Sequence, residues 1–224
     1  MKMAECVVFD IDDTLYLERD YARSGFEAVG KVVEKRTGRS GFWQSAWKAF
    51  ELGARGRVFD VALDELGIAK SDELIGELVT AYRCHQPQIS LLPDARRCLE
   101  ALGGRVKLAG VTDGPVESQH RKAEALDLLE RLEPLVLTGE LGSGFGKPHP
   151  RAFELVEAGT GAQGSRCLYV ADNPAKDFSG PRSLGWCTLR VRRPGGLHYE
   201  RESGPDVDAE VTDLAGLAAL IGLT

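Results

Sequence analysis

The sequence has no apolar run long enough to cross a bilayer and no Cys-x-x-Cys pair of the kind that binds zinc. The carboxylates from Asp10 onwards interrupt the apolar stretch near the N-terminus, so we expect no secretory signal there. The five cysteines are widely spaced and lie partly within apolar runs. They indicate buried free thiols in a reducing compartment, and we therefore expect a cytoplasmic protein.

Positive charge is in the minority: 28 lysines and arginines stand against 34 aspartates and glutamates, which gives a formal net charge of -6. A weakly acidic protein is a poor partner for nucleic acid or for an anionic membrane, so we expect neither. The chain has 224 residues, 43% of them hydrophobic. This is enough for one large globular domain, or for a core domain with a smaller companion.

Short apolar runs are present, and helix-length segments separate the later ones. They span residues 6–9, 106–111, 135–137, 167–171 and 187–191. Alternation of buried strands with helices predicts an α/β fold, in which helices cover a Rossmann-like parallel sheet.

Residues 19–90 interrupt this alternation with apolar residues at helical spacing and no strand between them. The stripes are Ala22, Phe26, Val29 and Val33; Trp43, Ala46, Trp47 and Phe50; and Leu74, Ile75, Leu78, Val79 and Tyr82. We predict a helical bundle inserted after the first strand, with Trp43 and Trp47 in its core. The polar, Gly- and Pro-rich residues 193–208 are predicted to form a surface loop.

Polar residues follow several of the apolar runs directly. They are Asp10, Asp12, Thr112, Asp113, Asp172 and Asp177, with Lys147 after a glycine-rich stretch. Ligands of open parallel sheets bind beyond the carboxyl ends of the strands. We therefore expect these side chains to gather at one edge of the sheet.

Like charges at such an edge need a counter-charge, because two carboxylates about 4 Å apart repel by about 4 kcal/mol at an effective dielectric of about 20. Lys147 is one cation against four aspartates, which are Asp10, Asp12, Asp172 and Asp177. Oxygen ligands without histidine or cysteine favour Mg²⁺ over Zn²⁺. The metal could hold a phosphate, whose remaining oxygens Thr112 and Lys147 would contact.

The ordered set Asp10-x-Asp12-x-Thr14, Thr112, Lys147-Pro148 and Asp172-x4-Asp177 resembles the four motifs of the haloacid dehalogenase-like (HAD) hydrolase superfamily. The long stretch between the first two motifs resembles members with a helical cap inserted there. The resemblance implies an α/β core of residues 1–18 and 91–224, with a cap of residues 19–90. It also implies a magnesium-dependent phosphomonoester phosphatase acting on a small phosphorylated metabolite.

The resemblance implies a role for each motif residue. Asp10 would be the nucleophile that forms an aspartyl-phosphate. Asp12 would be the general acid for the leaving alcohol and then the base for water, while its backbone carbonyl binds the metal. Thr112 and the backbone amide of Asp113 would hold the phosphoryl group, and Lys147 would offset the charge on Asp10 and the phosphate.

Two further aspartates would complete the metal site. Asp172 would be a direct ligand of Mg²⁺, and Asp177 would support its water shell or orient Lys147. The implied metal set is therefore Asp10, Asp12, Asp172 and Asp177.

This chain departs from the common motif pattern at two positions, with Asp113 where asparagine is usual and Asp13 where glycine is usual. An extra carboxylate at Asp113 has an electrostatic cost beside a phosphate. Asp12 itself argues against carbon–halogen cleavage, because the true dehalogenases of the superfamily lack an acid at this position.

Other side chains allow two interpretations. Arg83 and His85, at the return from the cap, could contact substrate or a hinge, or could form an exposed helix end. Arg190, Arg192 and Arg193 could form a basic patch, although a solvated strand end is the better prediction.

Alternatives to a phosphatase stay open at this stage. A phosphomutase of the same fold would need a cap that retains its monophosphate product. A phospho-accepting signalling domain or a non-catalytic binding scaffold belongs to a different class, and neither has reason to carry a lid. The substrate could be a sugar phosphate, a nucleoside monophosphate or phosphoglycolate.

Overall fold

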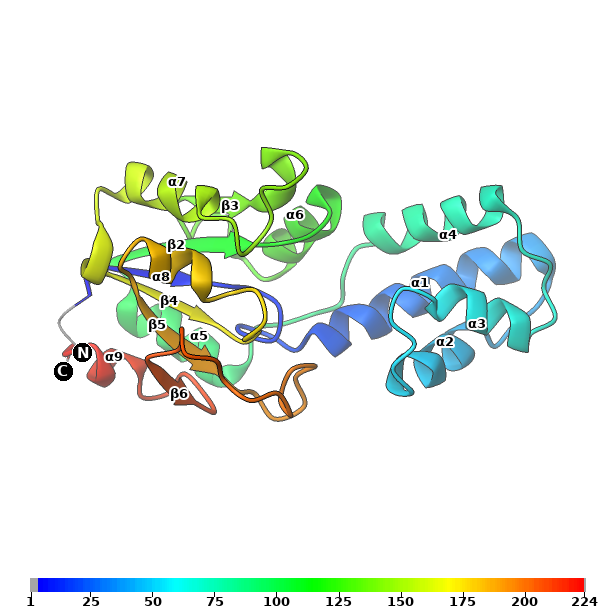
Figure 1. Cartoon of the computed structure of the whole chain (residues 1–224). Helices are drawn as coiled ribbons and strands as arrows, with labels where there is room; N and C mark the ends of the chain where they lie inside the picture. The colour runs from blue at the N-terminus through cyan, green and yellow to red at the C-terminus, as the bar shows by residue number, and fades with distance from the viewer. Residues whose placement is uncertain (1–3, 224) are drawn as a thin grey trace. The chain divides into compact units, whose positions relative to one another are not determined.

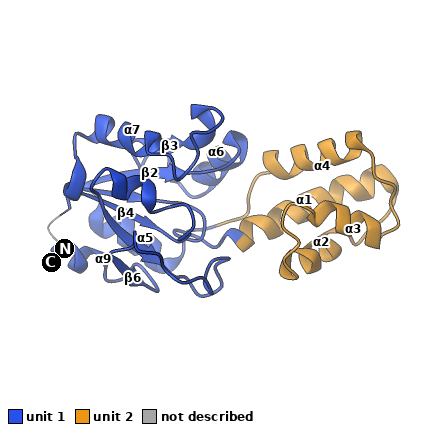
Figure 2. Ribbon diagram, in the orientation of Figure 1, with its two compact units in different colours: residues 1–18, 90–224 blue, residues 19–89 orange. Residues whose placement is uncertain are grey.

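The computed structural model describes residues 4–223. The chain divides into two compact units, with residues 1–18 and 90–224 in unit 1 and residues 19–89 in unit 2 (Figure 2). The predicted insertion, residues 19–90, ends one residue later than unit 2. Its role as a cap stays a prediction.

Unit 1 is built on one sheet of six parallel strands in the order β3-β2-β1-β4-β5-β6. The strands are β1 (Cys6–Phe9), β2 (Lys107–Thr112), β3 (Leu135–Leu137), β4 (Cys167–Ala171), β5 (Cys187–Val191) and β6 (Ala209–Val211). The five predicted apolar runs all form strands, which confirms the α/β class. β6 was not predicted, because a three-residue strand with a central glutamate has no apolar run.

Helices cover both faces of the sheet, as Figure 1 shows. α7 (Arg151–Thr160) and α8 (Ser179–Ser183) lie on one face, and α5 (Pro93–Leu102) and α9 (Leu217–Leu220) on the other. Phe153 of α7 packs edge-to-face on Tyr169 of β4 and on Trp186. Every residue of β1 and β4 is buried, so these strands read as continuous apolar runs rather than as alternating ones.

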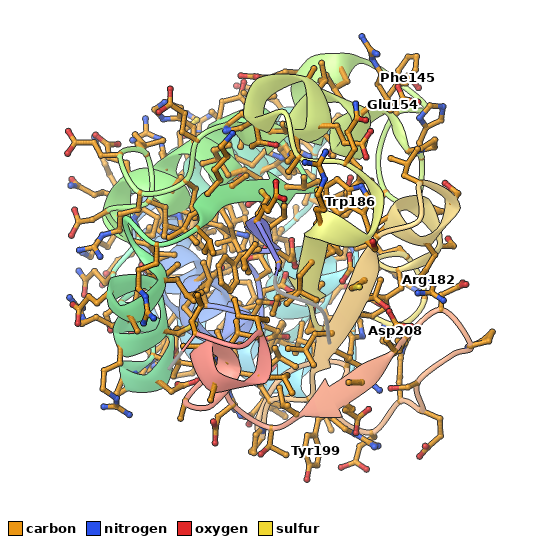
Figure 3. The ribbon with its side chains drawn as sticks, turned by 90° about the vertical axis from the view of Figure 1, so that its left-hand side faces the viewer. Phe145, Glu154, Arg182, Trp186, Tyr199 and Asp208 are labelled. Atoms are coloured by element: carbon orange, nitrogen blue, oxygen red, sulfur yellow. The ribbon has the colours of Figure 1, made fainter. Side chains whose placement is uncertain are left out.

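An ion pair between Arg182 and Asp208, next to the edge strand β6, helps to hold this strand in the sheet. Arg182 Nη1 lies 2.8 Å from both carboxylate oxygens of Asp208, a pair that Figure 3 shows at the surface of unit 1. Asp208 Oδ2 also accepts a hydrogen bond from the backbone N–H of Thr188 on β5. These contacts hold the chain that enters β6 against β5.

The remaining short elements of unit 1 connect its strands. They are α6 (Val116–Ala125) and the 3-10 turns η1 (Thr138–Leu141) and η2 (Gly164–Arg166). α6 follows β2 directly, so its first turns lie close to the carboxyl end of that strand.

Unit 2 is a bundle of four helices. They are α1 (Glu18–Thr37), whose first residue belongs to unit 1, α2 (Phe42–Glu51), α3 (Val58–Glu65) and α4 (Asp72–Cys84). The prediction that Trp43 and Trp47 lie in the core was wrong, since both are half-buried. The guanidinium of Arg19 lies 5.4 Å from the Trp47 ring centroid, and that of Arg23 lies 5.9 Å from the Trp43 ring. Cation–π contacts of this kind suit a half-exposed indole.

Within residues 4–223, no helix is both long and apolar enough to cross a membrane. All five cysteines are free thiols. Cys6, Cys98 and Cys167 are buried as predicted, whereas Cys187 is half-buried and Cys84 is exposed, so the prediction of burial was wrong for Cys84.

Gly25 of α1 allows a close approach of α4. A Cβ atom at this position would lie 2.3 Å from the ring of Tyr82, which itself packs on Phe26 and Phe59. We expect Gly25→Ala to lower the free energy of unfolding by about 1–3 kcal/mol, because the crowded ring has to move. Urea denaturation followed by circular dichroism measures the change.

Gly76→Ala on α4 is the matched control, because nothing lies within 4 Å of a Cβ atom there. It should leave the free energy of unfolding unchanged or raise it by up to about 1 kcal/mol. Equal losses in the two variants would contradict the account of this contact.

Candidate active site

A buried lysine links two of the predicted site residues. Lys147 Nζ lies 2.8 Å from Asp10 Oδ1, at the end of β1, and 2.7 Å from Asp177 Oδ1, beyond β4. The same ammonium donates to the Tyr169 hydroxyl at 3.2 Å. Asp10, Lys147 and Asp177 are all buried. The structure thus brings residues from three distant parts of the chain into one contact.

Burial and charge set the protonation of this group. Burial lowers the pKa of Lys147, but Asp10 and Asp177 outweigh it and hold the pKa well above its usual value. Burial raises the pKa of Asp10 to about 7, although Lys147 pulls it down. Burial, reinforced by Asp177 and Asp10, also raises the pKa of Asp172 well above its usual value. One lysine therefore does not compensate the three carboxylates.

The same three carboxylates fit a metal ion. Oxygens of Asp10, Asp172 and Asp177 all lie within 4.8 Å of one another, and all three residues are buried. The backbone N–H of Asn173 donates to Asp177 Oδ2 at 2.8 Å and keeps that carboxylate turned towards the group. A buried set of hard oxygen donors with excess negative charge suits a divalent cation.

Asp12 lies next to this group, but its side chain has separate partners. Lys122 Nζ lies 2.7 and 2.9 Å from its two carboxylate oxygens, Gln119 Nε2 donates to Oδ2 at 3.1 Å, and the Tyr16 hydroxyl donates to Oδ1. Burial raises the pKa of Asp12, but these donors outweigh it, so the pKa lies below its usual value. The proposed contact of a metal with the Asp12 carbonyl stays a prediction.

Lys122 and Gln119 were not predicted, although the sequence holds a signal for them. They stand three positions apart on α6, which follows the motif residues Thr112 and Asp113, so they share one face of that helix. Both side chains are buried, and Gln119 Oε1 accepts from the Thr112 hydroxyl at 2.9 Å.

Asp113 has a cation of its own. Its Oδ2 lies 2.9 Å from Lys176 Nζ, while Oδ1 accepts from the Thr138 hydroxyl at 2.6 Å and from the backbone N–H of Lys147. Burial raises the pKa of Asp113, but Thr138 and Lys176 outweigh it and hold the pKa below its usual value. The expected cost of the extra carboxylate is therefore offset by Lys176, which the sequence analysis missed.

Asp13 uses a conformation that few residues tolerate. Its φ is 49°, in the left-handed region, where aspartate is one of the acceptable residues after glycine. Its carboxylate accepts from the backbone N–H groups of Glu18 at 2.8 Å and Leu197 at 2.7 Å. Asp13 thus ties the loop after β5 to the first motif, and burial raises its pKa to about 6.

Arg190, within β5, and Arg193, just after it, contradict the prediction of a solvated strand end. Arg190 is fully buried, with Nε donating to the backbone carbonyl of Asp172 at 3.0 Å and Nη2 to that of His198. Arg193 is also buried and donates to the carbonyl of Thr14 at 2.8 Å. A guanidinium can be buried in this way because carbonyl oxygens accept its several N–H groups.

The substrate candidates Arg83 and His85 belong to unit 2. Arg83 is exposed in the last turn of α4. His85 is buried, lies with Nδ1 2.6 Å from the Tyr82 carbonyl and packs on the Tyr21 ring. The interpretation of His85 as an exposed helix end was wrong, and contact of either residue with substrate stays a prediction.

Comparisons with known proteins agree with this site. The family model of the haloacid dehalogenase-like hydrolases matches residues 4–185, which include all of the motif residues. The chain is 28% identical to glyceraldehyde 3-phosphate phosphatase of Methanopyrus kandleri over 92% of this chain and 91% of that protein. It is 34% identical to phosphoserine phosphatase of Thermus thermophilus over 68% of this chain and 60% of that protein. Other relatives are named dehalogenases.

Solved structures show the same fold. The HAD-hydrolase YfnB of Bacillus subtilis, in a crystal form bound to magnesium, has a TM-score of 0.70 over 99% of this chain and 100% of that chain. At 18% identity this likeness bears on the fold alone, and it confirms the predicted α/β architecture.

The raised carboxyl pKa values predict how stability depends on pH. Asp10 and Glu18 have a pKa of about 7 and Asp13 of about 6, chiefly because of burial, whereas unfolded carboxyls titrate near pH ~4. A raised pKa stabilises the fold fully below the unfolded pKa, and this contribution is lost as pH rises through the folded pKa. Asp12 and Asp113, with lowered pKa values, act in the opposite sense only below the usual carboxyl range.

We therefore expect the Tm of the metal-free protein to fall between about pH 5 and pH 8. Mg²⁺ competes with protons for the same oxygens, so the rise in Tm that it causes should be larger at the higher pH. Differential scanning fluorimetry with MgCl₂ or EDTA measures both effects, with Asp172→Asn as the variant that should lose the response. A larger Mg²⁺ response at the lower pH would contradict this assignment.

Proposed function

Because the chain belongs to the haloacid dehalogenase-like hydrolases, we propose that it is a Mg²⁺-dependent phosphomonoester phosphatase acting on a small phosphorylated metabolite. The observation that carries the proposal is the pair of carboxylates at the end of β1. Asp10 contacts Lys147, and Asp12, two residues on, contacts Lys122. The two neighbouring acids thus pair with different lysines, which supports different roles for them: Asp10 as nucleophile and Asp12 as acid and base.

The second carboxylate also favours a phosphatase over a dehalogenase. An alkoxide leaving group needs a proton, which a group such as Asp12 can supply. A halide ion leaves without one, so carbon–halogen cleavage gives Asp12 no task. The side chain of Asp12 is 19% exposed while its partner Lys122 is 4% exposed, so the carboxylate is the part of this pair that a substrate can reach.

In the first step Asp10 attacks phosphorus and forms an aspartyl-phosphate, while the bond from phosphorus to the leaving oxygen breaks. Burial raises the pKa of Asp12, but its hydrogen-bond donors outweigh burial and lower the pKa, so Asp12 is ionised in the free protein. Asp12 therefore takes the proton of the bound phosphate monoester monoanion and passes it to that oxygen, and an alcohol leaves. Lys147 offsets the charge on Asp10 and on the phosphoryl oxygens. Thr112 and the backbone amide of Asp113 hold the phosphoryl group in place.

In the second step water attacks the phosphorus of the aspartyl-phosphate. Asp12, again ionised, takes a proton from that water and gives it up to the departing inorganic phosphate, and the free carboxylates of Asp10 and Asp12 result. The same residue thus acts as acid and then as base, and atoms and charge balance over the cycle.

A metal ion at Asp10, Asp172 and Asp177, with the carbonyl of Asp12 as a further ligand, would supply positive charge for the phosphoryl oxygens. Asp177 also contacts Lys147 at 2.7 Å, so it holds the lysine as well as supporting the metal.

Unit 2 is proposed to be the cap that excludes water from the site. The free thiols support a reducing, cytoplasmic location.

We expect phosphate release from a panel of phosphorylated metabolites to require Mg²⁺ and to stop with EDTA. The panel holds sugar phosphates, nucleoside monophosphates and phosphoglycolate, with glyceraldehyde 3-phosphate and phosphoserine added because the relatives act on them. Asp10→Asn should lower turnover by at least about a thousandfold. A malachite-green assay measures the released phosphate.

Asp20→Asn, an exposed aspartate of α1, is the matched control and should keep full activity. Turnover that survives Asp10→Asn would refute the nucleophile. Transfer of the phosphoryl group within a substrate, without release, would point to a phosphomutase instead.

A further inference from the structure

We infer that Lys122 is a positioning residue, which holds the Asp12 carboxylate in place for proton transfer to the leaving group, and that Gln119 is the donor displaced from Asp12 when substrate binds. This inference deepens the proposed function and rests on it. The three residues come from two parts of the chain far apart in sequence, the loop after β1 and the helix α6. Asp12 and Lys122 form an ion pair at 2.7 Å.

The present contacts of the Asp12 carboxylate use nearly all of its capacity to accept hydrogen bonds. A carboxylate offers about four lone-pair positions on its two oxygens. Oδ1 receives Lys122 and the Tyr16 hydroxyl, and Oδ2 receives Lys122 and Gln119. To donate a proton to a substrate oxygen, Asp12 has to carry that proton at one of these positions, so one of the present donors has to leave.

The contact with Gln119 is the one that is exchanged most cheaply. At 3.1 Å it is longer than the contacts from Lys122 and from the other neutral donor, Tyr16, and its donor is a neutral amide. Hydrogen bonds from charged donors are roughly twice as strong as neutral ones. The lysine therefore stays in contact and fixes the carboxylate plane while the amide gives way.

The side-chain amide of Gln119 is itself held by hydrogen bonds at both its oxygen and its nitrogen. Its Oε1 accepts from the Thr112 hydroxyl at 2.9 Å, and its Nε2 donates to Asp12 and, at 3.3 Å, to the backbone carbonyl of Asp113. Gly114 leaves room for this arrangement, since a Cβ atom there would lie 2.8 Å from Gln119 Nε2. The amide thus joins the proposed phosphate contact, Thr112, to the proposed acid, Asp12.

The test compares two leaving groups. An alkyl phosphate such as glycerol 3-phosphate needs its leaving oxygen protonated, whereas p-nitrophenyl phosphate releases a stable anion. The ratio kcat/KM reports the steps up to formation of the aspartyl-phosphate, so it isolates the role of the acid. Lys122→Met should lower kcat/KM about a hundredfold for the alkyl ester and less than about fivefold for the aryl ester.

Two further variants distinguish a positioning role of Lys122 from a general loss of activity. Lys122→Arg keeps the charge and should recover part of the loss on the alkyl ester. Lys107→Met removes another lysine of unit 1, which donates to the Thr160 carbonyl. This variant should leave the ratio of kcat/KM for the alkyl ester to kcat/KM for the aryl ester unchanged. Equal losses on both esters in folded Lys122→Met, or no loss on either, would overturn the positioning role.

A double-mutant cycle tests the contact without turnover. Asp12→Asn and Lys122→Met each leave a buried partner without its counter-charge, so each should lower the urea midpoint, and the double variant should lose less than the sum. Midpoint losses that simply add would overturn the contact. If the wild type hydrolyses neither these esters nor any member of the panel, the proposed function fails and the role in proton transfer fails with it, whereas the cycle still decides whether Lys122 holds Asp12.

Discussion

The ammonium of Lys147 between Asp10 and Asp177 is the interaction on which the rest of the site depends. Both oxygens lie within 2.8 Å of Nζ, and all three side chains are buried. Removing one partner of a buried ion pair costs about 3–5 kcal/mol, because the other charge is left without compensation. The ends of β1 and β4 and the loop before α7 therefore have to meet for the fold to form.

The remaining charges of the site are arranged in further lysine–carboxylate pairs. Asp12 contacts Lys122, and Asp113 contacts Lys176. The uncompensated negative charge is thereby concentrated at one place, the oxygens of Asp10, Asp172 and Asp177. This distribution gives the proposed metal a location and leaves Asp12 outside its set of carboxylate ligands, where it can carry protons.

Much of the fold and part of the site followed from local sequence patterns. The buried strands are continuous apolar runs, and the motif residues stand directly after them, so both are visible in the sequence. Lys176 is not visible in the sequence, because a lysine in a loop has the same local pattern whether it is solvated or buried beside a carboxylate. Lys122 is indicated only by its spacing from Gln119 on α6, and that spacing does not name Asp12 as its partner. The prediction for Arg190, which lies within β5, was wrong for the same reason: only the folded chain shows the carbonyls that accept its hydrogen bonds.

The most direct test of the account is to trap the phosphorylated Asp10. Asp12→Asn lacks the base for the second step, and p-nitrophenyl phosphate needs no acid in the first, so the covalent intermediate should accumulate when both are combined with Mg²⁺. Mass spectrometry of the acid-quenched protein measures the modification and its position. The account predicts the gain of one phosphoryl group on Asp10; an unmodified Asp10 while p-nitrophenol is released would contradict it.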